Sequence, residues 1–200
     1  MFDARLRPLL DGPLSRTAAV LDRPAVTPDR LTLLGLVLGL ACAVASALAW
    51  WPAAAVLWLL SRAADGLDGP LARRRGPRDA GAGGFLDITC DFVVYGATVV
   101  GVALGAGGPL WPFLLVLLAY YVNGTAFLAF SSIAERAGRR IDDGRSLSFL
   151  GGLAEGAETI LVHTLWLVLP FWASRIALVW AVLVAVSAAQ RVVAGYRALR

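Results

Sequence analysis

Long apolar stretches dominate this sequence and limit the folds that it can adopt. Of its 200 residues, 58% are hydrophobic, and a soluble domain of this length cannot bury so much apolar surface in one core. A membrane-spanning helix needs roughly 20 mostly apolar residues, and the chain holds about six such stretches. The sequence therefore predicts an integral membrane protein in which residues 1–200 form a single membrane domain.

These apolar stretches are expected to be helices. Lipid offers the backbone no hydrogen-bonding partner, so only helices and closed barrels cross it, and the two-residue alternation of barrel strands is missing here. We predict an all-α fold with six transmembrane helices. Their expected ranges are 31–51, 52–73, 84–106, 110–133, 149–169 and 173–194.

Residues 1–25 precede the first span and carry several charges. They contain no apolar core of the length that a signal peptide requires. Phe2, Leu6, Leu9 and Leu10 recur at helical spacing, which favours a short interfacial helix lying on the membrane. A frayed terminus is the open alternative.

The basic residues are all arginine, and most of them fall in alternate connections between the expected spans. They gather before the first span, between the second and third, between the fourth and fifth, and at the C-terminus, whereas the other connections carry only Arg175. Because cytoplasmic loops are enriched in basic residues, we expect a plasma or inner membrane protein with both termini in the cytoplasm. The basic face would meet anionic lipid headgroups, so the net charge of +4 requires no nucleic-acid partner.

Four aspartates lie in or beside apolar helical segments. Asp65 and Asp68 are three residues apart and Asp87 and Asp91 are four apart, so each pair shares a helix face. A carboxylate near hydrocarbon costs on the order of 2.5–3.5 kcal/mol, which predicts a polar cavity with compensating cations at the cytoplasmic side. Carboxylate oxygens suit Mg²⁺ or Mn²⁺, and two such ions about 3.5–4 Å apart would clamp a phosphoryl group.

Small and basic residues separate the two aspartate pairs. Gly69, Ala72 and Arg73 follow the first pair, and further arginines and glycines come before the second. Small residues let a ligand approach the helix backbone, and arginine can pair with a pyrophosphate. The pattern predicts a phosphorylated ligand.

The run from Asp65 to Arg73, followed by Gly83, Asp87 and Asp91, resembles the signature of the CDP-alcohol phosphotransferase family, D-x2-D-G-x2-A-R-x8-G-x3-D-x3-D. All eight fixed residue types match, and the one departure is that nine residues, not eight, separate Arg73 from Gly83.

A second segment extends this resemblance. Residues 27–32, Thr-Pro-Asp-Arg-Leu-Thr, are similar to the Thr-Pro-Asn-x-Leu-Thr start of the family's first span, with Asp29 in place of asparagine.

The resemblance implies roles for the matched residues. Metal ligands would be Asp65, Asp68, Asp87 and Asp91, the general base would be Asp91, and contacts to the CDP moiety would come from Gly69, Ala72, Arg73 and Gly83. The implied reaction of phospholipid biosynthesis transfers a phosphatidyl or related group from a CDP-linked lipid, such as CDP-diacylglycerol, to an alcohol and releases CMP. It also implies a homodimer. The acceptor stays open among glycerol 3-phosphate, inositol phosphate, serine, another phospholipid and other alcohols.

A membrane ion or proton transporter is the alternative function, because carboxylates inside the membrane also mark conduction pathways. Such transporters place polar residues across the membrane depth and use paired broken helices. In this sequence the aspartates gather near one face, which favours the transferase.

Three more polar residues lie in the fifth expected span. Glu155 and Glu158 either line the cavity or complement the positive end of the helix dipole, and these alternatives stay open. His163 is expected to make a hydrogen bond between helices.

Overall fold

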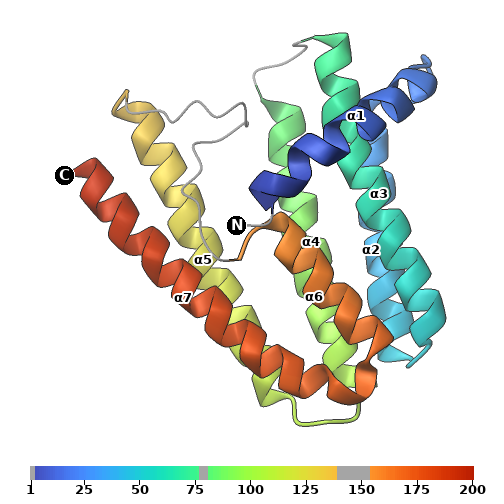
Figure 1. Ribbon diagram of the computed structural model, residues 1–200, viewed down its shortest axis with the longest axis vertical. Coiled ribbons are helices and arrows are strands. Elements are labelled where there is room, and N and C mark those ends of the chain that lie inside the picture. Colours follow the sequence, from blue (N-terminus) through green and yellow to red (C-terminus); the bar gives the residue numbers. More distant parts are fainter. Residues whose placement is uncertain (1–2, 77–80, 139–153) are drawn as a thin grey trace.

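The computed structural model describes residues 3–76, 81–138 and 154–200, and these parts are helical with no strand (Figure 1). They form seven α-helices and a 3₁₀ turn at Pro170–Trp172. The α-helices are α1 (Asp3–Leu21), α2 (Pro28–Ala47), α3 (Trp51–Arg75), α4 (Ala82–Gly105), α5 (Trp111–Arg136), α6 (Gly156–Val168) and α7 (Ala173–Leu199). The prediction of an all-α fold is confirmed.

Four of these helices are long and apolar enough to cross a membrane. They are α2, α4, α5 and α7, the last counted together with the 3₁₀ turn before it. The 25 residues of α3 are long enough, but charged side chains interrupt its second half. The 13 residues of α6 cover about 20 Å, less than the roughly 30 Å of a hydrocarbon core. The chain is a multi-pass membrane protein, and six complete spans remain a prediction.

Helix α2 differs at both ends from the first expected span, 31–51. It begins earlier, at Pro28, because the side chain of Thr27 caps it by accepting a hydrogen bond from the backbone of Arg30. It also ends earlier, at Ala47, and Ala49 then turns the chain with a φ of 57°. Hydropathy locates the apolar residues, whereas capping and turn geometry set the helix ends.

The fifth expected helix, 149–169, also differs at its start. Ala154 and Glu155 are not helical, and α6 begins only at Gly156 because the backbone of Glu155 is extended. Residues 149–153 lie outside the described residues.

Helix α2 holds one group of helices together, since it packs against both α3 and α4. Glycines permit the close contact with α4: a Cβ atom on Gly101 would clash with the backbone of Ala43, and one on Gly105 would clash with the carbonyl of Ser46. The pair α5 and α7 forms a second group that splays away from the first (Figure 1). As a result α2 sets the separation between α3 and α4.

Aromatic side chains join the two groups around His163 of α6. The ring of His163 is fully buried and stacks on Trp58 of α3, with 4.9 Å between ring centroids. Its Nε2 lies 2.9 Å from the hydroxyl of Tyr120, which also accepts a hydrogen bond of 2.7 Å from Nε1 of Trp180. His163 therefore makes the interhelical hydrogen bond that the sequence predicted.

An N-terminal helix is present and is longer than the short one expected. Helix α1 has 19 residues and crosses obliquely over the end of α3 (Figure 1). Its buried Ala18 packs with Leu31 and Leu71. Just after it, Asp22 accepts a hydrogen bond of 2.8 Å from Nε of Arg75, so this segment is tied to the C-terminal end of α3.

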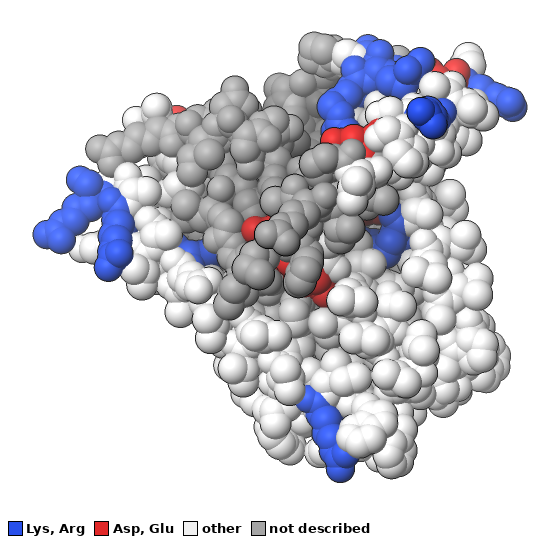
Figure 2. Space-filling model, viewed as in Figure 1, with Lys and Arg blue, Asp and Glu red and all other residues white. Residues whose placement is uncertain are grey.

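Basic side chains are concentrated at one end of the molecule. Figure 2 shows them over α1 and at the end of α7, whereas the lower part is white except for one basic area. This arrangement matches the sequence, in which arginines gather in alternate connections between the expected spans. Which end faces the cytoplasm remains a prediction.

Candidate active site

Two antiparallel helices supply the acidic side chains. Asp65 and Asp68 lie in the second half of α3, and Asp87 and Asp91 lie in the first half of α4. Because both helices pack on α2 and run in opposite directions (Figure 1), these two halves face each other. The meeting of the two pairs therefore depends on α2, on which both helices pack.

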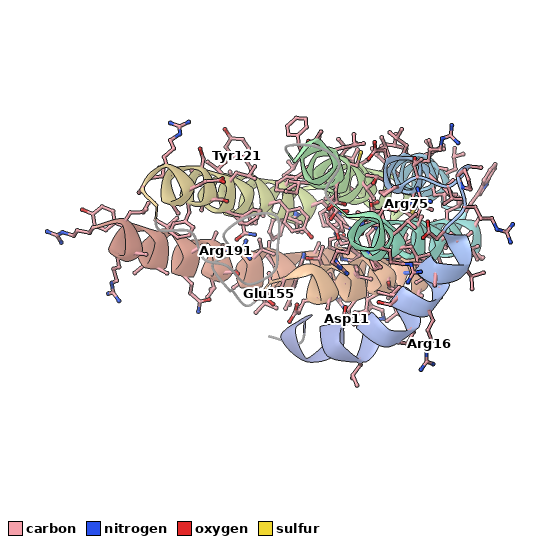
Figure 3. All side chains as sticks on the ribbon, turned by 90° about the horizontal axis from the view of Figure 1, so that it is seen from above. Asp11, Arg16, Arg75, Tyr121, Glu155 and Arg191 are labelled. Atoms are coloured by element: carbon pink, nitrogen blue, oxygen red, sulfur yellow. The ribbon has the colours of Figure 1, made fainter. Side chains whose placement is uncertain are left out.

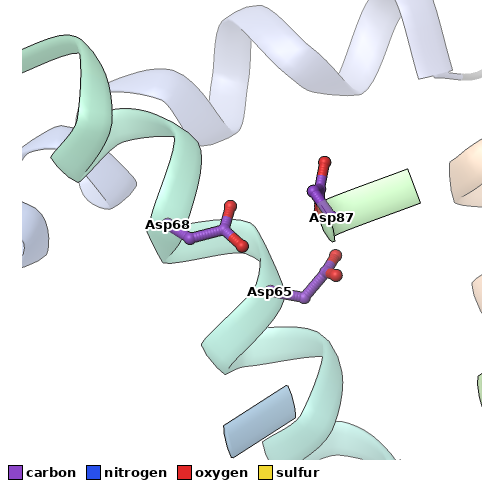
Figure 4. Close-up of side chains that lie close together, drawn as sticks. All are labelled: Asp65, Asp68 and Asp87. Carbon is purple, nitrogen blue, oxygen red and sulfur yellow. The ribbon is translucent and has the colours of Figure 1, made fainter. Parts of the chain in front are cut away.

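Asp65, Asp68 and Asp87 form an acidic cluster. One carboxylate oxygen from each lies within 4.8 Å of the others, and Figure 4 shows the three side chains directed into a common space. Carboxylates this close repel one another unless a cation lies between them. Three hard oxygen donors fit Mg²⁺ or Mn²⁺, and no histidine or cysteine of the described residues belongs to the cluster, which disfavours zinc.

Asp68 is the most enclosed member of the acidic cluster, with 7% of its surface exposed. The buried hydroxyl of Thr32 in α2 donates a hydrogen bond of 2.6 Å to its Oδ2. Thr32 thus orients the Asp68 carboxylate, and it belongs to the segment that resembles the start of the family's first span.

Asp91 has a different partner. Its Oδ1 lies 2.6 Å from Nη1 of Arg62, a side chain of α3 that is only 5% exposed. The same nitrogen lies 3.5 Å from Oδ2 of Asp65. The four predicted aspartates are therefore neighbours, but three form the acidic cluster and the fourth forms an ion pair beside it.

The residues expected to contact CDP lie at the same end of the helices. Ala72 and Arg73 are exposed on the last turns of α3. A Cβ atom on Gly69 would lie 3.3 Å from Nη1 of Arg73, and one on Gly83, in the first turn of α4, would lie 3.8 Å from Oδ1 of Asp29. The guanidinium of Arg73 thus lies directly against Gly69, one residue after Asp68, where a side chain larger than hydrogen would crowd it.

The family model for CDP-alcohol phosphatidyltransferases matches residues 25–188 of the sequence. This chain belongs to the CDP-alcohol phosphatidyltransferase family. The match contains helices α2 to α6, so all the residues of the site described above lie within it. CDP-alcohol phosphatidyltransferases transfer lipid head groups, which makes the chain a transferase.

Two relatives extend the comparison along the chain. The inner membrane protein YnjF of Escherichia coli (strain K12) is 40% identical over 211 residues, covering 100% of this chain and 98% of that protein. Archaetidylinositol phosphate synthase of Pyrococcus horikoshii is 32% identical over 149 residues, covering 69% of this chain and 78% of that protein.

Crystal structures of the phosphatidylinositol phosphate synthase PgsA1 of Mycobacterium tuberculosis share the fold. The complex with manganese and citrate superimposes with a TM-score of 0.72 at 26% identity and covers 92% of this chain and 88% of that chain. The form with CDP-DAG bound gives a TM-score of 0.70 at 24% identity, covering 92% and 93%. The helical arrangement of this transferase therefore matches solved members of similar length.

Arg62 is a site residue that the sequence interpretation missed. A signal was present, because an arginine inside an apolar run is costly and this one comes three residues before Asp65. The sequence indicates topology signals and phosphate contacts as the roles of the arginines, and a counter-charge for the aspartates is a third role that only the contact with Asp91 shows.

Arg191, which the sequence indicates as a topology signal of the C-terminus, also lies inside the protein. It is 5% exposed, its guanidinium lies 5.8 Å from the ring centroid of Phe127, and Figure 3 shows it between α7 and α5, whereas Tyr121 points outward. Of the two glutamates, Glu155 occupies the N-cap and Glu158 the first turn of α6. These positions complement the helix dipole, and neither residue belongs to the acidic cluster.

Proposed function

We propose that this transferase moves a phosphatidyl or related substituted phosphate group from a CDP-linked lipid to an alcohol and releases CMP. The observation that carries the proposal is the acidic cluster, in which family-motif aspartates of α3 and α4 come within 4.8 Å. The structure of the M. tuberculosis relative with CDP-DAG bound supports a CDP-lipid donor.

We propose that Asp65, Asp68 and Asp87 bind divalent cations, with Mg²⁺ or Mn²⁺ fitting the oxygen donors. The manganese complex of the M. tuberculosis relative supports this assignment. When bound, two such ions would neutralise the pyrophosphate and stabilise charge on the leaving CMP. The family resemblance also makes Asp91 a ligand, and its contact with Arg62 competes with that role.

The chain's own residues then have distinct tasks. Asp91 accepts the proton of the acceptor hydroxyl as the acceptor oxygen attacks the β-phosphorus of the donor. A new oxygen–phosphorus bond forms, the bond from that phosphorus to the bridging oxygen breaks, and CMP leaves with the bridging oxygen. Arg73 pairs with the pyrophosphate, while Gly69, Ala72 and Gly83 leave room for the CDP moiety. Holding donor and acceptor together supplies much of the rate enhancement.

The site's position suits a membrane-embedded donor. We propose that the basic end of the helices faces the cytoplasm, that the lipid donor enters sideways from the bilayer, and that the alcohol arrives from the cytosol. The name of the E. coli relative supports an inner membrane location. We also propose a homodimer, with residues 1–200 as one domain in each copy.

The proposal is tested by CMP release from CDP-diacylglycerol. Purified protein in detergent would be incubated with Mg²⁺ or Mn²⁺ and with a panel of alcohols, including glycerol 3-phosphate, inositol phosphate and serine. We expect metal-dependent CMP release with one acceptor and near-complete loss of turnover in Asp91→Asn, which keeps the side-chain shape but cannot take the proton.

Two results would contradict this function. Full turnover in Asp91→Asn would remove Asp91 as the base. Failure of the wild-type protein to bind CDP-diacylglycerol in the presence of metal would reject the donor and would favour the transporter alternative, for which ion flux into proteoliposomes is the direct assay.

A further inference from the structure

We propose that Arg62 is a positioning residue that holds Asp91 beside the acidic cluster, so that Asp91 remains available as the proton acceptor and is not a firm metal ligand. The inference rests on the proposed function. It assigns a task to a buried arginine that lies outside the family signature, and it gives a reason why Asp91 stands outside the acidic cluster.

The position of Arg62 allows a single nitrogen to bridge two carboxylates. Arg62 lies one helical turn before Asp65, and its Nη1 is 2.6 Å from Oδ1 of Asp91 and 3.5 Å from Oδ2 of Asp65. The same nitrogen is 3.3 Å from the hydroxyl of Tyr95, one turn beyond Asp91. Arg62 therefore contributes its positive charge where α3 and α4 approach each other.

Neighbouring side chains hold this guanidinium in place. Its Nη2 donates a hydrogen bond of 3.1 Å to Oγ of Ser61. The guanidinium carbon lies 5.2 Å from the ring centroid of Trp58 and 5.1 Å from that of Tyr95, distances at which cation–π attraction operates. Trp58 is itself fixed by a 3.0 Å hydrogen bond from its Nε1 to Thr164. Arg62 is thus a preorganised part of the site and not a mobile side chain that happens to reach Asp91.

The charges at the site give Arg62 two effects. It engages Oδ1 of Asp91 through a charge-assisted hydrogen bond, which orients the carboxylate and leaves Oδ2 for the acceptor proton. Its positive charge also repels a metal ion near Asp91. Asp65 lies farther from the guanidinium, at 3.5 Å, and its carboxylate converges with those of Asp68 and Asp87, so the ion is directed to these three.

The test separates metal affinity from turnover. Binding of Mn²⁺ alone to the purified protein would be measured from the electron paramagnetic resonance signal of free Mn²⁺, in parallel with CMP release. In Arg62→Gln we expect at least about fivefold tighter Mn²⁺ binding, because a repelling charge is gone, together with a fall in turnover of about tenfold or more. Arg175→Gln, at the opposite end of the molecule, is the matched control and should change neither quantity.

Conservative variants complete the test. Arg62→Lys keeps the charge but loses the planar fork and the stacking, so Mn²⁺ affinity should stay within about twofold while turnover falls at least about fivefold. Asp91→Asn should keep Mn²⁺ affinity within about twofold while turnover is lost.

Opposite results overturn the proposal. A joint loss of Mn²⁺ binding and turnover in Arg62→Gln would identify a structural role, and unchanged turnover in either Arg62 variant would remove the positioning role. Weak Mn²⁺ binding in Asp91→Asn would make Asp91 a ligand. If the wild-type protein releases no CMP, the proposed function fails separately, and the Mn²⁺ measurements still decide how Arg62 acts on the metal site.

Discussion

Replacing Thr32 by valine should weaken metal binding although Thr32 is not a proposed ligand. Its hydroxyl donates a 2.6 Å hydrogen bond to Oδ2 of Asp68, and both side chains are buried. Valine has nearly the same shape, so the packing of α2 against α3 should persist. What is lost is the donor that holds the Asp68 carboxylate in the orientation that completes the acidic cluster.

Two independent estimates of the magnitude agree. A hydrogen bond to a charged group contributes roughly 1.5–3 kcal/mol. Loss of a group that orients a metal ligand typically costs about 10- to 100-fold in metal affinity, which corresponds to roughly 1.4–2.7 kcal/mol. We therefore expect Thr32→Val to weaken Mn²⁺ binding by about 10- to 100-fold and to raise the Mn²⁺ concentration needed for CMP release by a similar factor.

The assay is a titration of the purified protein with Mn²⁺, monitored by free-ion resonance and repeated by calorimetry. Thr89→Val is the matched control, because Thr89 is exposed on α4 and its hydroxyl donates a hydrogen bond to the carbonyl of Phe85 within its own helix. A Thr32→Val protein that melts like the wild type and binds Mn²⁺ within about twofold of it would refute the reasoning.

Two further predictions concern stability. Gly101→Val should lower the thermal midpoint in detergent by an amount equivalent to about 1–3 kcal/mol of overpacking, because any Cβ at this position meets the backbone of Ala43. Gly96→Ala is the control and should leave the midpoint unchanged, because a Cβ there meets nothing within 4 Å. Equal midpoints for the two variants would contradict the close helix contact. Arg75 lowers the pKa of Asp22 below its ordinary value of 3.8, so the pair stabilises the fold above that value and the contribution is lost as the pH falls through the lowered pKa. The midpoint of Asp22→Asn should accordingly lie below that of the wild type at neutral pH and converge with it in acid, and a constant gap across the titration would exclude the ion pair as its cause.

Several features of the site could be predicted because they depend on local spacing. The separations of Asp65 from Asp68 and of Asp87 from Asp91 put each pair on one helix face wherever the helices end. The free-energy cost of placing these carboxylates in an apolar setting already indicated that cations would compensate their charge. Likewise the buried His163 was expected to bond another helix, and it lies against Tyr120.

Helix boundaries were less predictable. The start of α6 depends on the extended backbone of Glu155, and the end of α2 on the turn at Ala49. Each helix end depends on a local backbone conformation that hydropathy does not predict. The long apolar runs predicted that there would be helices, but not the residues at which they begin.

The sequence by itself determined the all-α membrane fold, the family and the acidic character of the site, because these follow from apolar length, from helical spacing and from a motif of fixed residue types. Only the tertiary structure decided which side chain contacts each aspartate. Thr32 reaches Asp68 across 36 positions of sequence and Arg62 reaches Asp91 across 29, and both contacts exist because α2 holds α3 and α4 together. Coulombic and hydrogen-bond energies depend on distances in space, and for residues on different helices those distances are set by packing.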